Sequence, residues 1–290
     1  MAAPAELVGP LLTRCTFAPA GSAVTCAVSG GADSLALLVL AVSAGCQVTA
    51  VHVDHGLRPT GDDEAGVVAA AAARFDAAFD AVVVTVEPGP NLEARARAAR
   101  YAALPTDVVT GHTADDQAET VLLNLMRGAA LDGLAGMRPG PRHPLLALRR
   151  ADTRHLCAAL DLQPVEDPSN ADPAFRRNRV RAEVMPLLDD VAGRDVGAVV
   201  ARQAGLLRDD AELLDALARD IDPTDARALA AAPVALARRA VRLWLAGEHP
   251  VGADAVERVL AVARGEVTAC EITAVGRVAR SGGRLRVEPA

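Results

Sequence analysis

The sequence predicts an α/β fold with a doubly wound parallel sheet, followed by a smaller, mainly helical C-terminal domain. Short apolar runs rich in Val alternate with Ala-rich helical segments through the first half of the chain. Strands that are apolar along their whole length are typical of a parallel sheet whose two faces are covered by helices. After Pro186 the pattern becomes mainly helical. We therefore expect a first domain over residues 1–187 and a second over residues 188–290.

The elements of the first half alternate in a regular order. The predicted strands are Ala23–Val28, Val48–Val53, Ala81–Val86 and Asp107–Thr110. The predicted helices are Ser34–Ala44, Asp62–Phe75, Asn91–Leu104 and Thr113–Arg127. Thr113 and Asp116 have the spacing of a capping box, which supports the start of the last helix. Ligands of such sheets bind beyond the carboxyl ends of the strands, so a site is expected in the loops there.

The second half is less regular at first. Between Arg138 and Arg181, Pro and Arg are frequent and the periodicity weakens. The later helical patterns cover roughly Val199–Ala218, Pro233–Ala246 and Asp254–Ala263. The chain closes with a predicted strand pair, Arg277–Ala279 and Arg284–Val287, joined by a turn at Gly282-Gly283.

The composition excludes several classes of protein. A chain of 290 residues with 51% hydrophobic residues can build a sizeable core. Its net charge of −7 argues against a general nucleic-acid or membrane binder, although a local basic patch stays compatible with it. All 30 basic side chains are arginine, which excludes a lysine-dependent phosphate loop and a Schiff-base lysine. A coding bias toward Ala, Val, Arg and Gly explains the absence of lysine.

Two features indicate a cytoplasmic protein. The five cysteines form no CxxC motif, so they are interpreted as small buried residues in a reducing compartment. The N-terminal residues lack the basic start and long apolar core of a signal peptide. The stretch Ser34–Val53 is uncharged and long enough to span a bilayer, but Gly45-Cys46-Gln47 interrupts it. We interpret it as a buried helix and a buried strand, and expect no membrane partner.

The sharpest local motif is Ser29-Gly30-Gly31-Ala32-Asp33-Ser34, between the first strand and the first helix. Paired glycines let backbone N–H groups converge on an anion, and a helix N-terminus adds positive dipole. The serines supply hydroxyl groups, and Asp33 fits beside a phosphate if Mg²⁺ lies between them. The motif therefore predicts a phosphate-binding site. The alternative is a Gly-Gly turn in which Asp and Ser only cap the helix.

Three further stretches follow later strands or open helices. His52, Asp54 and His55 end the second strand, where the ribose or base of a nucleotide would lie, although a polar turn is the alternative. Arg97 and Arg100 share one helix face, which is also the pattern of a solvated stripe. His112 precedes Asp116 and Glu119, which lie on one face of the next helix. Paired carboxylates there can hold Mg²⁺ or a cationic amine, or serve as caps.

The segment from Arg138 to Arg181 contains nine Arg against five Asp and Glu. It includes Asn170 and the run Arg177-Asn178-Arg179-Val180-Arg181. Such a local basic strip suits contacts with RNA phosphates. The alternative is an arginine-rich loop that neighbouring acids hold in place.

Together these stretches resemble the bacterial tRNA(Ile)-lysidine synthase family of PP-loop ATP pyrophosphatases, which have a Rossmann-like fold. The resemblance spans roughly Val24 to Leu188. It rests on Ser-Gly-Gly-x-Asp-Ser, His-x-Asp-His-Gly-Leu-Arg, Gly-His-x-x-Asp-Asp-Gln-x-Glu-Thr, Glu-Asp-Pro-Ser-Asn and Arg-Asn-x-x-Arg. The sequence departs from the family at Asp54, where Asn is common, and at His143, where Arg is common. The C-terminal hundred residues match only loosely.

The resemblance implies a reaction on the wobble cytidine of the CAU anticodon of an isoleucine tRNA. ATP adenylates O2 of the cytosine, and free L-lysine then displaces AMP at C2 to give lysidine. The implied catalytic residues are Asp33, His112 and Asp116. Residues 29–34 with His52, Asp54 and His55 would bind ATP, and Asp33 would hold Mg²⁺ through the phosphates.

The resemblance also implies binding sites for the other two substrates. Asp116 and Glu119 would bind lysine. The residues expected to bind tRNA are Arg97, Arg100, Asn170, Arg177, Asn178 and Arg181, together with the C-terminal domain. The oligomeric state stays open, a homodimer included.

Three other functions share part of the pattern. A tRNA thiolase of the same superfamily needs sulfur-carrying or cluster-binding cysteines, and the sequence has no CxxC motif. An amidotransferase or NAD synthetase shares the loop but does not require the arginine strip. A non-enzymatic ATP-binding module would not need the paired carboxylates.

Overall fold

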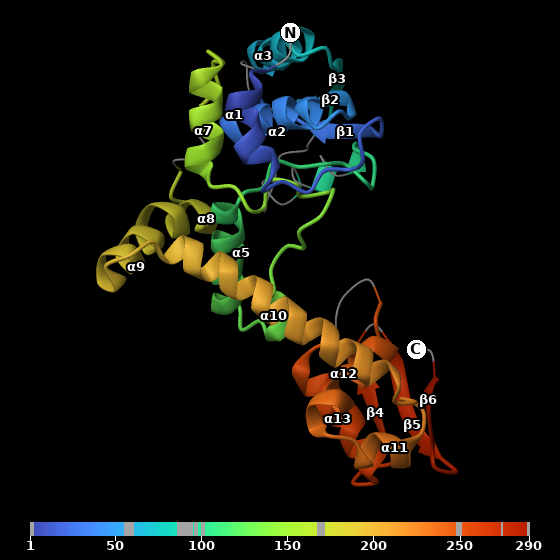
Figure 1. The fold of residues 1–290 in the computed structure, drawn as a ribbon. Helices are drawn as coiled ribbons and strands as arrows, with labels where there is room; N and C mark the ends of the chain where they lie inside the picture. The colour runs from blue at the N-terminus through green and yellow to red at the C-terminus, as the bar shows by residue number, and fades with distance from the viewer. Residues whose placement is uncertain are drawn as a thin grey trace. The chain divides into compact units, whose positions relative to one another are not determined.

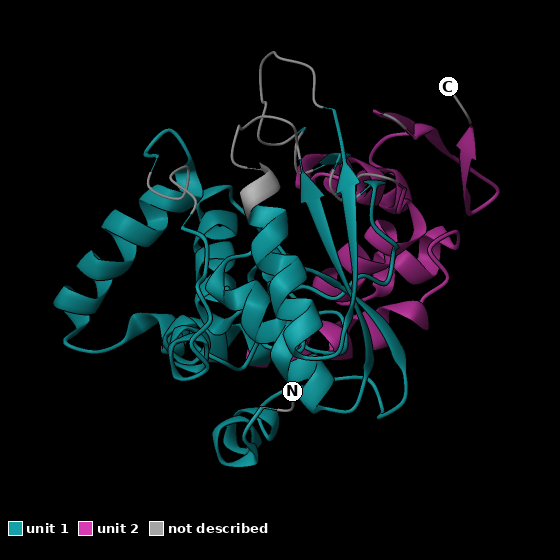
Figure 2. Cartoon of the chain, turned by 90° about the horizontal axis from the view of Figure 1, so that it is seen from above, with its two compact units in different colours: residues 1–205 teal, residues 206–290 magenta. Residues whose placement is uncertain are grey.

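The computed structural model describes residues 3–54, 61–85, 95, 98–99, 102–166, 172–247, 251–273 and 275–288, with residues 61–63 described as backbone only. The chain forms two compact units, Met1–Gly205 and Leu206–Ala290, coloured separately in Figure 2. The boundary falls inside helix α10 (Val196–Arg219), after the boundary that the sequence predicts at 187/188. Asp195, which follows the predicted boundary, forms an ion pair with Arg149 of the first unit.

The first unit is built on a parallel sheet. Its strands are β1 (Ala23–Ala27), β2 (Gln47–Asp54) and β3 (Ala78–Val83), in the order β1-β2-β3. Cys26 pairs with Ala50 of β2 and also forms a parallel bridge with Val109, so Val109 lies along the other edge of β1. The chain therefore runs outward from β1 through β2 and β3, and then returns to the opposite side of β1. This reversal creates a topological switch point at the carboxyl end of β1, the usual ligand site of such sheets.

Helices α2 (Ala32–Ser43) and α3 (Gly61–Arg74) pack against this sheet, and α1 (Ala5–Leu12) and α7 (Arg150–Ala159) pack against α2 (Figure 1). Helix α5 (Ala114–Met126) follows the segment that bridges to β1, and it packs against the short helix α6 (Leu131–Leu134). Helix α2 is buried from Ser34 to Ala41, which explains why this part of the sequence carries so few polar residues. The uncharged stretch Ser34–Val53 is thus a core helix and a core strand, as predicted. In the described part of the chain no helix is long and apolar enough to cross a membrane.

From Arg176 onward the first unit is mainly helical. This segment contains α8 (Arg176–Arg179), the π-helix η2 (Val180–Val184) and α9 (Met185–Ala192). Helix α7 and this segment were not among the predicted elements, because Pro and Arg obscure the periodicity there. Strand β3 begins earlier than the predicted Ala81. The predicted helix Asn91–Leu104 lies mostly outside the described residues.

The second unit has its own core. It contains α11 (Ala226–Ala231), α12 (Val234–Trp244) and α13 (Ala253–Arg264), with the antiparallel strands β4 (Ala269–Ile272), β5 (Gly276–Ser281) and β6 (Arg284–Glu288). Leu260, Val278 and Leu285 are buried together in it. The predicted closing strand pair is confirmed. Strand β4 is a third strand of this sheet that was not predicted, because its four residues show no clear strand pattern.

Candidate active site

The loop after β1 turns tightly into α2. Gly30 has φ +85°, a left-handed conformation that favours glycine. The backbone N–H of Ser29 donates to Ser34 Oγ at 3.1 Å, and the Ser34 hydroxyl donates to the Gly31 carbonyl at 2.8 Å. These bonds hold the loop at the N-terminus of α2, where the helix dipole favours an anion. The loop can therefore receive a phosphate group without a basic side chain of its own.

The segment after Val109 lies directly against this loop. A Cβ atom on Gly111 would be 2.6 Å from the Asp33 carbonyl oxygen, a distance that real Cβ atoms do not adopt. Only glycine allows the two backbones to approach so closely. The contact brings His112, the residue after Gly111, next to the first turn of α2.

Asp33 is the acidic side chain of the loop. The Thr153 hydroxyl of α7 donates to Asp33 Oδ1, and Arg150 Nε lies 3.5 Å from Oδ2. Burial raises the pKa of Asp33, against the opposing effect of the Thr153 hydrogen bond. A carboxylate is a ligand that Mg²⁺ prefers, and a Mg²⁺ bound here would take its other ligands from phosphates and water. The residues present therefore fit the magnesium that the motif predicts.

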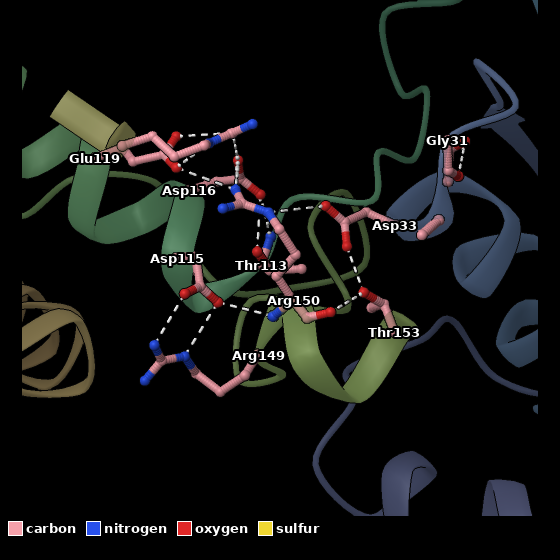
Figure 3. Close-up of polar contacts among 12 residues, drawn as sticks. Gly31, Asp33, Thr113, Asp115, Asp116, Glu119, Arg149, Arg150 and Thr153 are labelled. Atoms are coloured by element: carbon pink, nitrogen blue, oxygen red, sulfur yellow. Dashed lines mark hydrogen bonds and ion pairs between the residues drawn. The ribbon is translucent and has the colours of Figure 1, made fainter. Parts of the chain in front are cut away.

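Next to Asp33 lies an acid–arginine cluster, formed by Asp116 and Glu119 of α5 with Arg150, Arg177 and Arg181. Figure 3 shows Arg150 beside Asp116 and Glu119. Arg150 Nη2 lies 3.0 Å from Asp116 Oδ1 and 3.1 Å from Glu119 Oε1. Arg177 Nε and Arg181 Nε each lie 2.8 Å from a Glu119 oxygen. Glu119 is only 2% exposed, so three guanidinium groups compensate a buried carboxylate.

The two oxygens of the Asp116 carboxylate have different partners. Its Oδ2 accepts hydrogen bonds from the Thr113 backbone N–H and hydroxyl, both at 2.9 Å, which confirms the predicted capping box. Its other oxygen faces the arginines of the cluster. Burial alone would raise the pKa of Asp116, but the charges of Arg150 and Arg177 outweigh it and lower the pKa. The side chain is therefore an anion at neutral pH.

Asp115 points away from the cluster and joins α5 to α7. It accepts from Arg149 Nε at 3.1 Å and Nη2 at 2.9 Å, and from the Arg150 backbone N–H at 2.8 Å. Burial would raise the pKa of Asp115, but the hydrogen bond from Arg149 and that from the Arg150 backbone lower it overall. This pair aligns the first turns of α5 and α7, which carry the cluster.

Two histidines meet at a buried hydroxyl group. Thr110 Oγ1 lies 2.7 Å from His112 Nδ1 and 2.8 Å from His143 Nδ1. The two imidazole rings are 5.2 Å apart and nearly perpendicular. Burial, with a smaller effect from Arg142, lowers the pKa of His143.

His52 and Asp54 lie at the end of β2. The His52 ring is buried, and its Nδ1 lies 3.0 Å from the Val28 carbonyl, which can only accept. His52 therefore carries a hydrogen on Nδ1 and donates it to the backbone directly before the phosphate loop. Asp54 is half-buried as the last residue of the strand.

A cavity of about 150 Å³ lies beside Glu119. Its lining includes acidic side chains from three segments, Asp115, Asp189 and Asp195. Arg149, Arg150 and Arg181 line it as well. Groups of both signs thus face one small space within the first unit.

The comparisons with known proteins agree with this geometry. A family model described as a PP-loop domain matches residues 11–188. The chain is 51% identical over 243 residues to a tRNA(Ile)-lysidine synthase of Nocardia farcinica, covering 78% of this chain and 76% of that protein. It is 43% identical over 290 residues to the tRNA(Ile)-lysidine synthase of Rhodococcus jostii, covering 92% and 85% of the two chains. The chain belongs to the tRNA(Ile)-lysidine synthase family.

A solved structure supports the fold of this lysidine synthase family member. A U34-tRNA thiolase from Methanococcus maripaludis superposes with a TM-score of 0.55 at 16% identity, covering 70% of this chain and 79% of that one. At this level of identity the likeness shows the PP-loop fold alone.

The structure brings together most of the residues that the lysidine synthase resemblance implies. Asp33, His112, Asp116 and Glu119 lie around the switch point, with Ser29 to Ser34 on one side. Arg177 and Arg181, expected to bind tRNA, turn toward Glu119. Asn178 donates to the Asp172 carbonyl at 2.9 Å. The predicted residues outside the described ones are His55, Arg97, Arg100 and Asn170.

Four residues that contact this site were not among the predicted site residues. Arg150 and Thr153 contact Asp33, while Thr110 and His143 extend from His112. The arginine-rich stretch was the signal that could have revealed Arg150. One of its two interpretations was that neighbouring acidic residues hold these arginines in place. Arg149, Arg150, Arg177 and Arg181 follow that interpretation, because each forms an ion pair with Asp or Glu.

Proposed function

We propose that this chain ligates free L-lysine to C2 of the wobble cytidine in the CAU anticodon of tRNA(Ile). ATP is consumed to AMP and diphosphate, and an adenylated cytidine is the intermediate. The product, lysidine, changes the codon specificity of the tRNA from AUG to AUA. The cytoplasm, where tRNA and ATP are available, is the compartment in which this reaction would run.

One observation carries the proposal beyond family membership. Arg150 lies between Asp33 of the phosphate loop and the carboxylates Asp116 and Glu119, within 3.5 Å of all three (Figure 3). The phosphate-binding loop and the two carboxylates proposed to bind an amine thus contact the same guanidinium group. An enzyme that first activates a base with ATP and then delivers an amine needs this arrangement, because both steps occur at the same carbon–oxygen centre.

The adenylation step uses the loop. Backbone N–H groups at the start of α2 and the hydroxyls of Ser29 and Ser34 would stabilise charge that develops on the departing diphosphate. Mg²⁺ held through Asp33 and the phosphates would supply charge neutralisation. His112, adjacent to the loop through Gly111, would position or protonate a reacting oxygen.

The lysine step uses the carboxylates. Asp116 and Glu119 would bind the cationic end of lysine, which would have to compete with the guanidinium groups that now contact them. The adjoining cavity supports this assignment. Its acidic side chains suit the ammonium groups of lysine, and Arg149 or Arg181 suits the carboxylate.

Recognition of tRNA would involve the basic strip and the second unit. A guanidinium has five N–H donors, so Arg177 and Arg181 could contact a phosphate while they also contact Glu119. The proposed contacts from Arg97, Arg100, Asn170 and Asn178 complete the expected surface. The C-terminal domain would select the tRNA.

The test is release of diphosphate from ATP with each substrate supplied or withheld. The expected result is release that depends on the cognate tRNA, with lysidine formed only when lysine is added. Replacement Asp33→Ala should abolish both, and near-normal activity of this variant would remove Asp33 from the mechanism. Release with ammonia and a small acid, or ATP binding without turnover, would contradict the proposed function.

A further inference from the structure

The hydroxyl of Thr110 is shared by two imidazole rings. Its Oγ1 is 2.7 Å from His112 Nδ1 and 2.8 Å from His143 Nδ1, and the residue is only 9% exposed. The Arg142 carbonyl is the third neighbour of this oxygen, at the longer distance of 3.4 Å. The Thr110 backbone N–H donates to the same carbonyl at 3.0 Å, which fixes the hydroxyl between the two rings.

Counting hydrogens restricts the two rings. A hydroxyl group has one hydrogen to donate, whereas a neutral imidazole carries a hydrogen on only one of its nitrogens. The hydroxyl can give its hydrogen to His112 Nδ1, to His143 Nδ1 or to the Arg142 carbonyl, and the two ring nitrogens are closer than the carbonyl. When the hydroxyl donates to one Nδ1, it can only accept from the other, so the two neutral histidines then hold opposite Nδ1 states.

We propose that Thr110 and His143 are positioning residues that set which nitrogen of His112 carries its proton. This rests on the proposed function only in that His112 serves the reaction. When His112 Nδ1 donates to Thr110, its Nε2 is a base. When Thr110 donates to His112 Nδ1, Nε2 carries a hydrogen and is a donor.

The two arrangements interconvert without a change of charge. The ring that carries the Nδ1 hydrogen first takes a proton at its Nε2, and its Nδ1 hydrogen then passes to Thr110 Oγ1 as the hydroxyl hydrogen passes to the other Nδ1. The second ring then releases the proton on its Nε2, so one proton enters, one leaves, and both rings are neutral again. His112 can thereby act as a donor toward one reacting group and as an acceptor toward another.

The surroundings of His143 favour the neutral form of its ring. Burial disfavours a cation on the His143 ring, and Arg142, its neighbour in the chain, acts in the same direction. The charged group that acts on His112 from α5 is Asp116. His143 is therefore expected to act on Thr110 as a neutral ring, through its tautomer.

The first test uses ¹⁵N-histidine NMR of the full chain without substrates, because nitrogen shifts distinguish the tautomers. At a pH where both rings are neutral, the Nδ1-protonated fractions of His112 and His143 should sum to about one. In His143→Arg the guanidinium only donates, so Thr110 must donate to His112, and the Nδ1-protonated fraction of His112 should fall to about zero. A sum near zero or two, or a His112 spectrum unchanged by His143→Arg, would overturn the proposal.

The second test is the rate of lysidine formation across pH. Thr110→Val should lower kcat by about tenfold or more and shift its pH profile, with KM for ATP within about twofold. Thr110→Ser keeps the hydroxyl and should restore both, while His155→Gln, on the exposed His155 of α7, is the matched control. Wild-type kcat and pH profile in Thr110→Val would also overturn the proposal. If the wild-type chain forms no lysidine, the proposed function fails, while the NMR result still decides the coupling.

Discussion

Arg150 connects the phosphate loop to the carboxylates of α5. It contacts Asp33 through Nε and the pair Asp116 and Glu119 through Nη2. A lysine could not make these contacts in the same way, because an ammonium group presents a single charge centre rather than a planar fork. In a chain without lysine, a guanidinium is the cation that connects these three carboxylates.

Glu119→Gln tests whether the buried carboxylate serves lysine or only its arginine partners. The amide offers one acceptor in place of two and turns an N–H₂ group toward guanidinium donors. We expect KM for lysine to rise about tenfold or more, since charged hydrogen bonds contribute about 1.5–3 kcal/mol. KM for ATP should stay within about twofold.

The measurement for Glu119→Gln is the lysine dependence of AMP formation. Glu183→Gln is the control, because Glu183 forms an exposed pair with Arg179 one helical turn away. If thermal stability falls while KM for lysine does not change, Glu119 is a counter-ion of the arginines and not a lysine ligand.

The residues of the site differed in how far the sequence could reveal them. Asp33, His112, Asp116 and Glu119 belong to short motifs in which a loop or one helix face places the side chains. Arg150 and His143 act through partners distant in the chain, and periodicity contains no information about such pairs. The net positive charge of the segment from Arg138 to Arg181 indicated RNA binding. The net charge of a segment does not show which acidic residues from elsewhere in the chain pack against it.

At the scale of elements, the contact of Gly111 with α2 sets the spacing between two strand ends. Gly111→Ala would force Cβ against the Asp33 carbonyl, at 2.6 Å in the present backbone. We expect a loss of about 1–3 kcal/mol of stability, typical of overpacking, and ATP binding weaker by about tenfold. Thermal unfolding and calorimetric titration with ATP measure the two effects.

The control for Gly111→Ala is Gly66→Ala in α3, where a new Cβ meets nothing within 4 Å. This change should stabilise the protein by about 0.5–1 kcal/mol, because Ala is the better helix residue. Equal ATP affinity in both variants would show that the close approach does not shape the loop.

Asp115 links the starts of α5 and α7, and its contribution to stability depends on pH. Its folded-state pKa lies below the ordinary value of 3.8, so the carboxylate stabilises the fold fully above that pH. The contribution is lost as the pH falls through the lowered folded-state value. Asp115→Asn should therefore reduce the free energy of unfolding by about 1–3 kcal/mol at pH 7.

Urea unfolding at several pH values checks the Asp115 prediction. The difference between Asp115→Asn and the wild type should shrink below pH 3.8. The exposed Asp107→Asn is the control and should change little at any pH. A difference that stays constant down to pH 3 would mean that ionisation of Asp115 does not stabilise the fold.

Elements with a clear period were predictable, and the others were not. The core of α2 and β2 reads as an uncharged stretch, and the capping box marks the start of α5. Helix α7 was not predicted, because its buried residues, Thr153, Leu156 and Cys157, lie between Arg and Asp side chains that serve the site. Function thus removed the hydrophobic regularity on which prediction depends.

At the scale of the whole molecule, each compact unit has a core of its own. Leu156 belongs to the first core and Leu260 to the second, and both are buried. Replacement of either by Ala should cost its own unit about 2–5 kcal/mol. The single tryptophan, Trp244, packs against the second core, so its fluorescence reports on that unit.

Leu260→Ala should shift the urea midpoint seen by Trp244 fluorescence, whereas Leu156→Ala should shift mainly the midpoint seen by circular dichroism. Leu213→Ala, on an exposed leucine, is the control. If both core variants move the fluorescence midpoint equally, the two units unfold as one.

The acid–arginine cluster with Asp33 has a thermodynamic consequence for substrate binding. Three arginines, Arg150, Arg177 and Arg181, face three carboxylates, Asp33, Asp116 and Glu119, so the formal charges of the set cancel. A cationic amine that enters makes the set positive and thereby raises its affinity for an anionic phosphate. By linkage, the phosphate raises the affinity for the amine by the same factor. Binding of the two substrates is therefore expected to be mutually cooperative through charge alone.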